Sequence, residues 1–306
     1  MSYIDMGNTL RGDEFMIDRN ELTSLVKLLD DPDEHVFEHI KSRLVSLGPE
    51  IIDFLEDVWQ QSLDALLQER IENIIHKIQF NEVKKELNLW LLGGAFDLLS
   101  GILAVNKYQY PDLDEQKIIN QIDTIKRDTW LQLGYEMSPL EKVKVLNHVF
   151  FHIHGFSGNT VNHQDPQNSY INLVLESKRG NQISLAIIYS LVAQKLDIPI
   201  YGVNLPQHFI LAYVDEQERL LPGFEAVNGV IFYINPFNKG FIFGRKDVDF
   251  FLKQLKLPQR DEYYEPCSNI EIIKRVFRNL ISSYNKLGYL DKVEELEELL
   301  QVVESH

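Results

Sequence analysis

Residues 168–213, NSYINLVLESKRGNQISLAIIYSLVAQKLDIPIYGVNLPQHFILAY, constrain the fold more than any other stretch of the chain. Gly180-Asn181 precedes a segment, 182–196, that is apolar on nearly all sides of a helix, which is typical of a helix buried within a domain. A short strand, a turn and a second strand beginning at His208 are predicted to follow. The pattern indicates an α+β core in which a buried helix begins close to a strand-borne histidine.

Further strands and helices are predicted around this core. The strand candidates are residues 200–205, 208–215, 229–234 and 240–243, with 216–227 as an excursion between two of them. Ser138-Pro139-Leu140-Glu141 has the spacing of a capping box and predicts a helix that runs to about residue 153. Asn168 is expected to cap a short helix over 169–176, and the apolar run 87–104 is expected to form a buried helix.

The two ends of the chain are predicted to be helical. Residues 28–59, with helices on either side of Gly48-Pro49, resemble one HEAT-type repeat, a class that generally stacks and binds proteins, although a helical cap on the next domain explains them as well. Two helices are predicted over 269–287 and 289–303, on either side of Gly288. Residues 275–300 within them resemble one tetratricopeptide-type unit or a plain helical hairpin. We therefore expect an N-terminal segment (1–85), a core (86–257) and a C-terminal hairpin (258–306).

The charge balance of the chain excludes some classes of partner. The formal net charge is -16, which disfavours nucleic acid and anionic membranes because both require clustered Lys and Arg. No apolar run approaches the roughly 18–20 residues of a membrane span, and the first 20 residues lack the pattern of a signal peptide. The single cysteine, Cys267, fits a reducing compartment. We expect a cytoplasmic protein, and the sequence does not predict its oligomeric state.

The order of chemical groups in the core is that of a papain-like active site. A nucleophile at a helix N-terminus is followed by a histidine on a strand and by a group that orients its imidazole. Here the helix begins near Gln182, His208 follows, and Asn235-Pro236 closes the third strand.

Several motifs, in order over 87–257, resemble the transglutaminase-like superfamily, and more closely its bacterial Sir-B-type branch. They are Leu146-Asn147, Gly155-Phe156-Ser157-Gly158-Asn159, Asn168-Ser169-Tyr170, Gly180-Asn181-Gln182-Ile183-Ser184-Leu185, Leu205-Pro206-Gln207-His208-Phe209 and Asn235-Pro236-Phe237. The resemblance implies a transglutaminase-like, papain-like α+β core with a helical tail.

The resemblance also assigns the positions of the family's catalytic residues. The family histidine maps to His208 and the family aspartate to Asn235, while the nucleophilic cysteine falls within 182–184, which contains no cysteine. We therefore expect a non-catalytic protein- or peptide-binding or regulatory module with an unknown partner. The alternative is a hydrolase or acyltransferase that uses Ser184, His208 and Asn235.

The groove between the central helix and the His208 strand supplies the candidate binding residues. They are Asn159, Asn168, Asn181, Gln182 and Gln207. For the three asparagines, the preferred interpretation is that they hold loops and helix starts through side-chain hydrogen bonds to the backbone.

No metal or cofactor is expected. His148 and His152, four residues apart on a helix, could chelate zinc, and His154 and His163 lie nearby in sequence. The glutamate of the metalloprotease pattern is missing, so surface or hydrogen-bonded histidines are the preferred interpretation.

Overall fold

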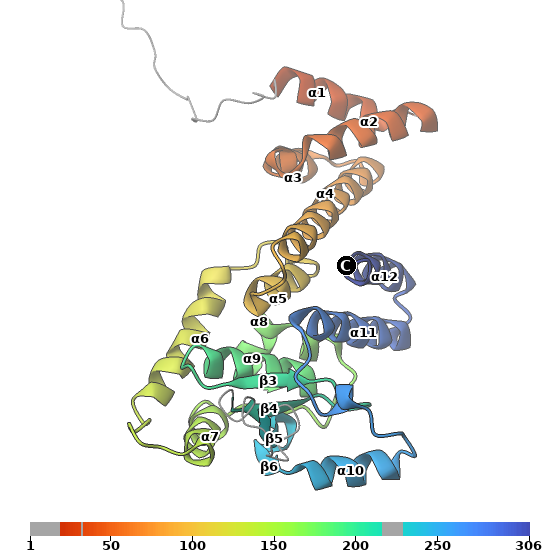
Figure 1. The fold of residues 1–306 in the computed structure, drawn as a ribbon. Helices are drawn as coiled ribbons and strands as arrows, with labels where there is room; N and C mark the ends of the chain where they lie inside the picture. Colours follow the sequence, from red (N-terminus) through yellow and green to blue (C-terminus); the bar gives the residue numbers. More distant parts are fainter. Residues whose placement is uncertain (1–18, 32, 216–228) are drawn as a thin grey trace, which may run out of the picture. The chain divides into compact units, whose positions relative to one another are not determined.

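The computed structural model describes residues 19–31, 33–215 and 229–306. The chain divides into two compact units, Met1–Glu82 and Val83–His306. Helix α4, Ala65–Leu92, contributes residues to both units (Figure 1). The predicted excursion over 216–227 lies outside the described residues.

The described part of the first unit consists of helices. These are α1 (Arg19–Lys27), α2 (Glu34–Leu47), α3 (Ile52–Gln61) and the first part of α4. Asp33 caps α2 by accepting a hydrogen bond from the backbone of His35, and Gly48 ends it with a φ of 76°. Aliphatic side chains from all four helices form one core that includes Leu22, Leu44, Leu55 and Ile71. The α2–Gly48-Pro49–α3 arrangement is the predicted one, and its assignment as a HEAT-type repeat stays a prediction.

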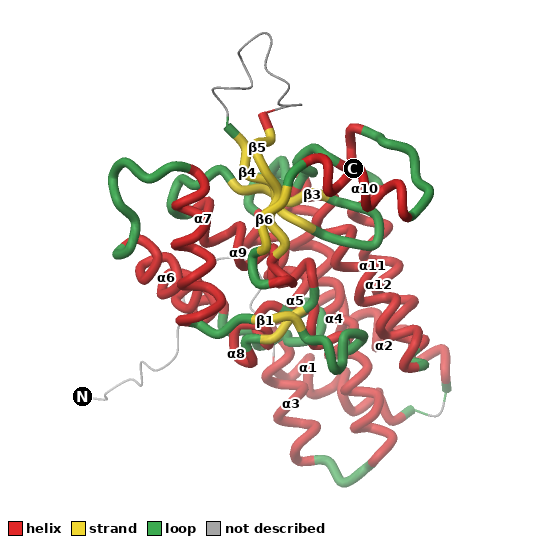
Figure 2. Tube along the Cα trace, turned by 90° about the horizontal axis from the view of Figure 1, so that it is seen from below, coloured by secondary structure: helices red, strands yellow, loops and turns green. Residues whose placement is uncertain are grey.

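The second unit is built around helix α9 and a four-stranded antiparallel sheet. Helix α9 spans Gln182–Gln194 and is buried from Ile183 to Ala193. The strands are β3 (Ile200–Val203), β4 (Ile210–Val214), β5 (Val230–Asn235) and β6 (Phe241–Phe243), and they are hydrogen-bonded in that order. Figure 2 shows this sheet apart from a short parallel pair, β1 (Ser157–Gly158) with β2 (Arg179–Gly180). An α+β core with helical flanks is therefore confirmed.

Both faces of the sheet are covered. Helix α9 contacts β3 and β4, while Val248 and Leu252 of α10 (Arg245–Gln254) pack against the opposite face. All five residues of β4 are buried, so this strand is a continuous apolar run rather than an alternating one. Helix α10 is an element that sequence analysis did not identify.

The remaining helices of this unit surround the core. They are α5 (Leu98–Lys107), α6 (Glu115–Trp130), α7 (Pro139–Asn147) with a π-helical turn (His148–Ile153), α8 (Ile171–Ser177), α11 (Asn269–Leu287) and α12 (Leu290–Glu304). The predicted capping box of Ser138 and Glu141 is present at the start of α7.

Three local predictions were wrong. The run 87–104 is not one helix: α4 ends at Leu92, and α5 starts after Asp97, which caps it through the backbone of Leu99 and Ser100. Strand β4 begins at Ile210, so His208 lies in the preceding turn. Asn168 does not cap α8, because a 3-10 turn over Pro166–Ser169 comes first and the side chain of Asn168 is bonded elsewhere.

The C-terminal helices belong to the second unit. Helix α11 contacts α5, α9 and the Pro166–Ser169 turn, and it buries one apolar side. Its fully or almost fully buried side chains include Ile272, Ile273, Val276, Phe277 and Leu280. The tetratricopeptide-type assignment of α11 and α12 stays a prediction.

Candidate functional site

The start of α9 is fixed by a reciprocal capping box. The side chain of Asn181 accepts a hydrogen bond from the backbone of Ser184 at 3.0 Å, and the Ser184 hydroxyl accepts one from the backbone of Asn181 at 3.0 Å. This hydroxyl also donates to the Asn181 carbonyl at 3.3 Å. Ser184 is fully buried. Its hydroxyl is therefore a structural part of the first helical turn.

The asparagines of the preceding loops hold the chain in place behind this cap. Asn181 Nδ2 donates to the Ser169 hydroxyl at 2.8 Å. Asn168 Oδ1 accepts from Asn159 at 2.9 Å, and Asn168 Nδ2 donates to the Asn162 carbonyl at 2.7 Å. Asn168 is almost fully buried. Asn159 and Asn168 thus serve the scaffold, whereas Asn181 also reaches the groove described below.

His208 is presented by a tight turn. Its backbone N–H donates to the Leu205 carbonyl at 3.0 Å, Pro206 occupies the second position and Gln207 has a φ of 61°. These are the features of a type II turn. The turn directs His208 toward the N-terminus of α9, as the sequence predicted, although the residue precedes β4.

Gln182, the first residue of α9, bridges His208 and the next residue. Its Oε1 accepts a hydrogen bond from the backbone N–H of Phe209 at 3.2 Å, which fixes the orientation of the carboxamide. Its Nε2 therefore donates to His208 Nδ1 at 3.0 Å. A nitrogen that accepts this bond carries no proton, so the imidazole is neutral with its proton on Nε2.

The surroundings of His208 also favour the neutral ring. Burial lowers the pKa of His208 below its usual 6.5, and the nearby Arg275 guanidinium lowers it further. The imidazole and the ring of Phe251 form a T-shaped pair, with centroids 4.7 Å apart and an interplanar angle of 77°.

The predicted triad is not assembled. Asn235 accepts a hydrogen bond from the backbone of Asn238 at 3.2 Å and so caps the turn that follows β5. Among the described residues, no hydrogen bond joins His208 to Ser184 or to Asn235. The residue that faces His208 within the window 182–184 is Gln182.

A groove lies over the start of α9. Its first cavity, of about 570 Å³, is lined by loop 160–164, by Asn181, Gln182 and Gln207, and by one face of α11. The α11 residues are Arg275, Asn279, Ser282, Ser283 and Lys286. Sequence analysis missed them, although their spacing of three to four residues marks a polar face of the helix. The described lining contains cations and no carboxylate.

A second cavity adjoins the first. It has a volume of about 560 Å³ and shares Gln164, Ser283 and Lys286 with the first. Tyr170 and Asp165 also line it. The shared residues make the two cavities parts of one elongated groove.

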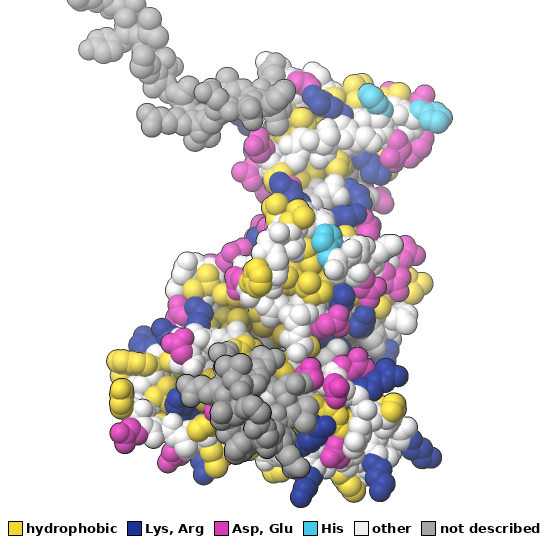
Figure 3. Space-filling view, viewed as in Figure 1, with side chains coloured by type: hydrophobic (Ala, Val, Ile, Leu, Met, Phe, Trp, Pro, Cys, Tyr) yellow, Lys and Arg dark blue, Asp and Glu magenta, His cyan; other side chains and the backbone are white. Residues whose placement is uncertain are grey.

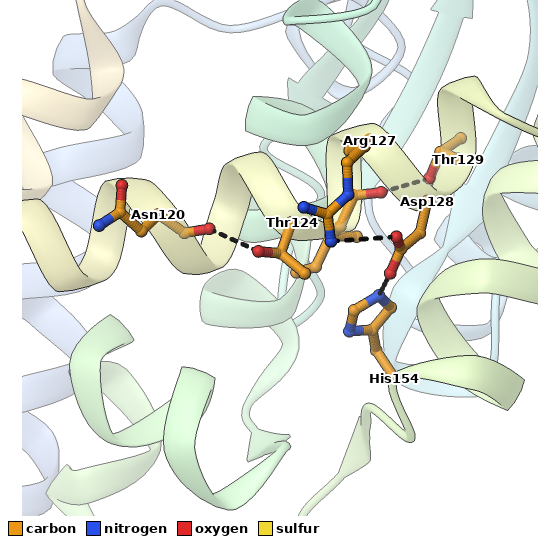
Figure 4. Close-up of polar contacts among 7 residues, drawn as sticks. Asn120, Thr124, Arg127, Asp128, Thr129 and His154 are labelled. Atoms are coloured by element: carbon orange, nitrogen blue, oxygen red, sulfur yellow. Dashed lines mark hydrogen bonds and ion pairs between the residues drawn. The ribbon is translucent and has the colours of Figure 1, made fainter.

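The histidines near α7 make other contacts. His154 Nε2 lies 3.0 Å from Asp128 of α6, which also contacts Arg127 at 3.5 Å (Figure 4). The rings of His148 and His152 stack with centroids 5.8 Å apart. In the part of the chain that the structure describes, no three His, Cys, Asp or Glu side chains are grouped so that they could hold a metal ion.

Residues 116–278, more than half of the chain, match the family described as "Transglutaminase-like superfamily", so the chain belongs to this superfamily. A UPF0162 protein of Xylella fastidiosa (strain Temecula1) is 31% identical over 209 residues, which cover 64% of this chain and 67% of that protein. No solved structure matches significantly.

Other relatives share shorter segments. A UPF0162 protein of Vibrio cholerae is 26% identical over 144 residues, 47% of this chain and 49% of its own length. F-box only protein 21 of Mus musculus is 26% identical over 157 residues, 51% of this chain and 23% of its own length. These names do not bear on the Sir-B-type branch, which stays a prediction. Among the helices of the described residues, none is both long and apolar enough to cross a bilayer.

Proposed function

We propose that this chain is a non-catalytic transglutaminase-like protein that binds a segment of another protein or a peptide in the groove over the start of α9. The observation that carries the proposal is the bridge made by Gln182. It occupies the first position of the helix whose N-terminus activates the nucleophile in the catalytic members. A carboxamide cannot act as that nucleophile, and here it engages the nitrogen of His208 that would take up the proton.

The other nucleophiles support the same conclusion. Ser184 is fully buried, and its hydroxyl is bonded within its own helical turn. Burial raises the pKa of the Cys267 thiol to about 12, which disfavours a reactive thiolate. A hydrolase built on Ser184, His208 and Asn235 would need a different arrangement of all three side chains.

The groove supplies the binding half of the proposal. Its two cavities are of the size that ligand sites commonly have, and polar side chains converge on them. The matched segment of F-box only protein 21 makes up less than a quarter of that protein. This supports the proposal that the transglutaminase-like fold can serve as one domain of a larger protein.

The catalytic half is tested with a chromogenic ester and with an amine-transfer assay. We expect wild-type turnover equal to that of His208→Ala. Turnover that is abolished by Ser184→Ala, in a variant with an unchanged circular dichroism spectrum, would establish the alternative hydrolase.

The binding half is tested by filling the groove. Ser282→Trp places an indole in the first cavity, whereas Asn285→Trp places one on an exposed part of the same helix that lines neither cavity. With a fluorescent pool of random octapeptides, binding is expected for the wild-type protein and for Asn285→Trp and is expected to be lost in Ser282→Trp. Equal binding by all three proteins would place the ligand outside the groove.

A further inference from the structure

We infer that the groove selects acidic segments, and that Arg275 and Lys286 bind their carboxylates. This inference rests on the proposed function, because it names the chemistry of the segment that the groove takes. Both cations project from the α11 face that lines the first cavity.

Arg275 is a half-buried cation without a counter-charge. Its guanidinium donates to the Asn204 side chain at 3.2 Å, a neutral partner. Its neighbours on α11 are paired: Lys274 lies 3.1 Å from Glu271, and Arg278 lies 2.7 Å from Glu304. Among the described residues, no carboxylate forms an ion pair with Arg275. Burial and the charge of Arg278 lower the pKa of Arg275, which indicates an environment unfavourable to its charge.

The guanidinium of Arg275 is therefore suited to bind an anion. A charge withdrawn from water is destabilising unless it is paired, and a carboxylate that enters the groove would supply the missing pair. A guanidinium can hold a carboxylate through two parallel hydrogen bonds, which adds geometric selectivity to the charge.

The local charge of the first cavity differs from that of the rest of the molecule. The chain carries a formal charge of -16, and acidic and basic side chains are interspersed over the face drawn in Figure 3. The described lining of the first cavity nevertheless has Arg275, Lys286 and His163 and no acidic residue. Asp165 is the one acidic residue in the described lining of the second cavity, which also has Lys286 and Lys292, so the cationic side chains continue along the groove.

The spacing of the two cations favours an extended segment. They lie eleven positions apart on α11, which corresponds to about 16 Å along a helix axis. An extended chain covers this length with about five residues. Two carboxylates about five residues apart on one segment could therefore reach both cations, and the adjoining second cavity gives the chain room to continue.

The test compares two fluorescent octapeptide pools with the full-length protein. In one pool, positions 2 and 7 are Asp or Glu; in the other they are Asn or Gln, and all remaining positions are random. We expect the acidic pool to bind about tenfold more tightly in low salt, with the preference falling as salt is added. Arg275→Gln and Lys286→Gln should each reduce the preference. Arg278→Gln, an exposed cation on the same helix, is the matched control and should retain it.

Each outcome bears on one claim. If both pools bind equally and Ser282→Trp abolishes the binding of both, the acidic selectivity is overturned while the binding groove stands. If the double variant Arg275→Gln/Lys286→Gln keeps the acidic preference, the selectivity comes from another surface and the inference fails. If micromolar inorganic phosphate displaces the acidic pool, the groove binds a small anion rather than an acidic peptide, and the inference is overturned. If neither pool binds at millimolar concentration, the inference and the proposed binding function fall together.

Discussion

At the scale of the single residue, Gln182 determines what His208 can do. The carboxamide can satisfy Phe209 N–H and His208 Nδ1 together only when the imidazole is neutral. The sequence placed the missing nucleophile within 182–184 but could not choose among the three residues, because the choice depends on where the turn before β4 brings the histidine. Of the three residues, Gln182 is the one whose side chain contacts His208, and we therefore propose it for the nucleophile position.

Gln182→Glu is predicted to raise the pKa of His208. A carboxylate next to Nδ1 favours the protonated ring and so opposes the lowering of the His208 pKa by burial and Arg275. NMR titration of the histidine signals in the full chain measures the pKa of His208. Gln207→Glu, at an exposed position that does not hydrogen-bond to His208, should change the pKa much less. An unchanged pKa in Gln182→Glu would mean that the bridge is absent.

The pH dependence of unfolding follows from the same residue. The folded pKa of His208 lies below the usual 6.5, so the unfolded chain binds more protons at mildly acidic pH. Its contribution to stability is therefore present above pH 6.5 and is lost as the pH falls through the folded pKa. In Gln182→Glu the sign reverses, and the contribution is lost as the pH rises through the raised pKa. Urea unfolding from pH 5 to 8 compares the two proteins, and parallel curves would contradict the assignment.

Ser184→Ala separates a structural hydroxyl from a catalytic one. The change leaves one of the capping bonds of Asn181 unmade, and we expect a loss of about 1–2 kcal/mol in the free energy of unfolding. Peptide binding should be unchanged, because Ser184 does not line the groove. A variant of full stability that no longer binds would argue against this role.

At the scale of the element, local sequence signals predicted helix ends well, but they predicted the adjoining turns and strand starts poorly. The capping box of α7 joins two residues that are three positions apart, and its pattern is recognisable in the sequence. The box at the start of α9 has the same spacing but was not predicted. The start of β4 follows from its pairing with β3, in which Ile210 lies opposite Val203. The 3-10 turn at Pro166–Ser169 begins at the cap Asp165, a local signal that sequence analysis missed. Asn168 was therefore predicted as a helix cap, whereas its side chain is bonded to Asn159 and Asn162.

Gly240→Ala tests the turn between β5 and β6. Gly240 has a φ of 71°, and a Cβ there would lie 2.0 Å from Asn147 Oδ1, which accepts the hydroxyl of Tyr189. We expect a loss of about 2–5 kcal/mol in the free energy of unfolding, from backbone strain and overpacking together.

Gly288, with a φ of 81° and no atom within 4 Å of its added Cβ, is the matched control. Gly288→Ala should cost only the strain, about 1–2 kcal/mol. Equal losses, measured by chemical denaturation, would exclude the close approach.

At the scale of the whole molecule, the C-terminal helices and the core form one packing unit. Sequence analysis predicts a boundary between the core (86–257) and the C-terminal hairpin (258–306), where the polar stretch 259–266 begins. Tyr264 is nevertheless buried, its carbonyl accepts the hydroxyl of Tyr233 at 3.0 Å, and the backbone of Cys267 donates to Gly202 of β3 at 2.8 Å. Such contacts are set by tertiary structure, so composition alone could not predict them.

Phe277→Ala tests this continuity. Phe277 of α11 is fully buried, and its truncation is expected to cost about 3–5 kcal/mol. Hydrogen exchange should accelerate at the backbone amides of α9 as well as α11, because the two helices pack together. Faster exchange confined to α11 and α12 would instead indicate a separate C-terminal domain.

The central claim is that position 182 is the nucleophile position and that the native chain has no nucleophile there. The most direct measurement compares the alkylation rates of Gln182→Cys and Ser184→Cys with iodoacetamide at pH 6 to 7. Cys267 contributes little background because burial raises its pKa to about 12. We predict that Gln182→Cys reacts at least about tenfold faster, because the helix N-terminus and His208 both favour its thiolate. Faster reaction of Ser184→Cys would contradict the account and return Ser184 to the reactive position.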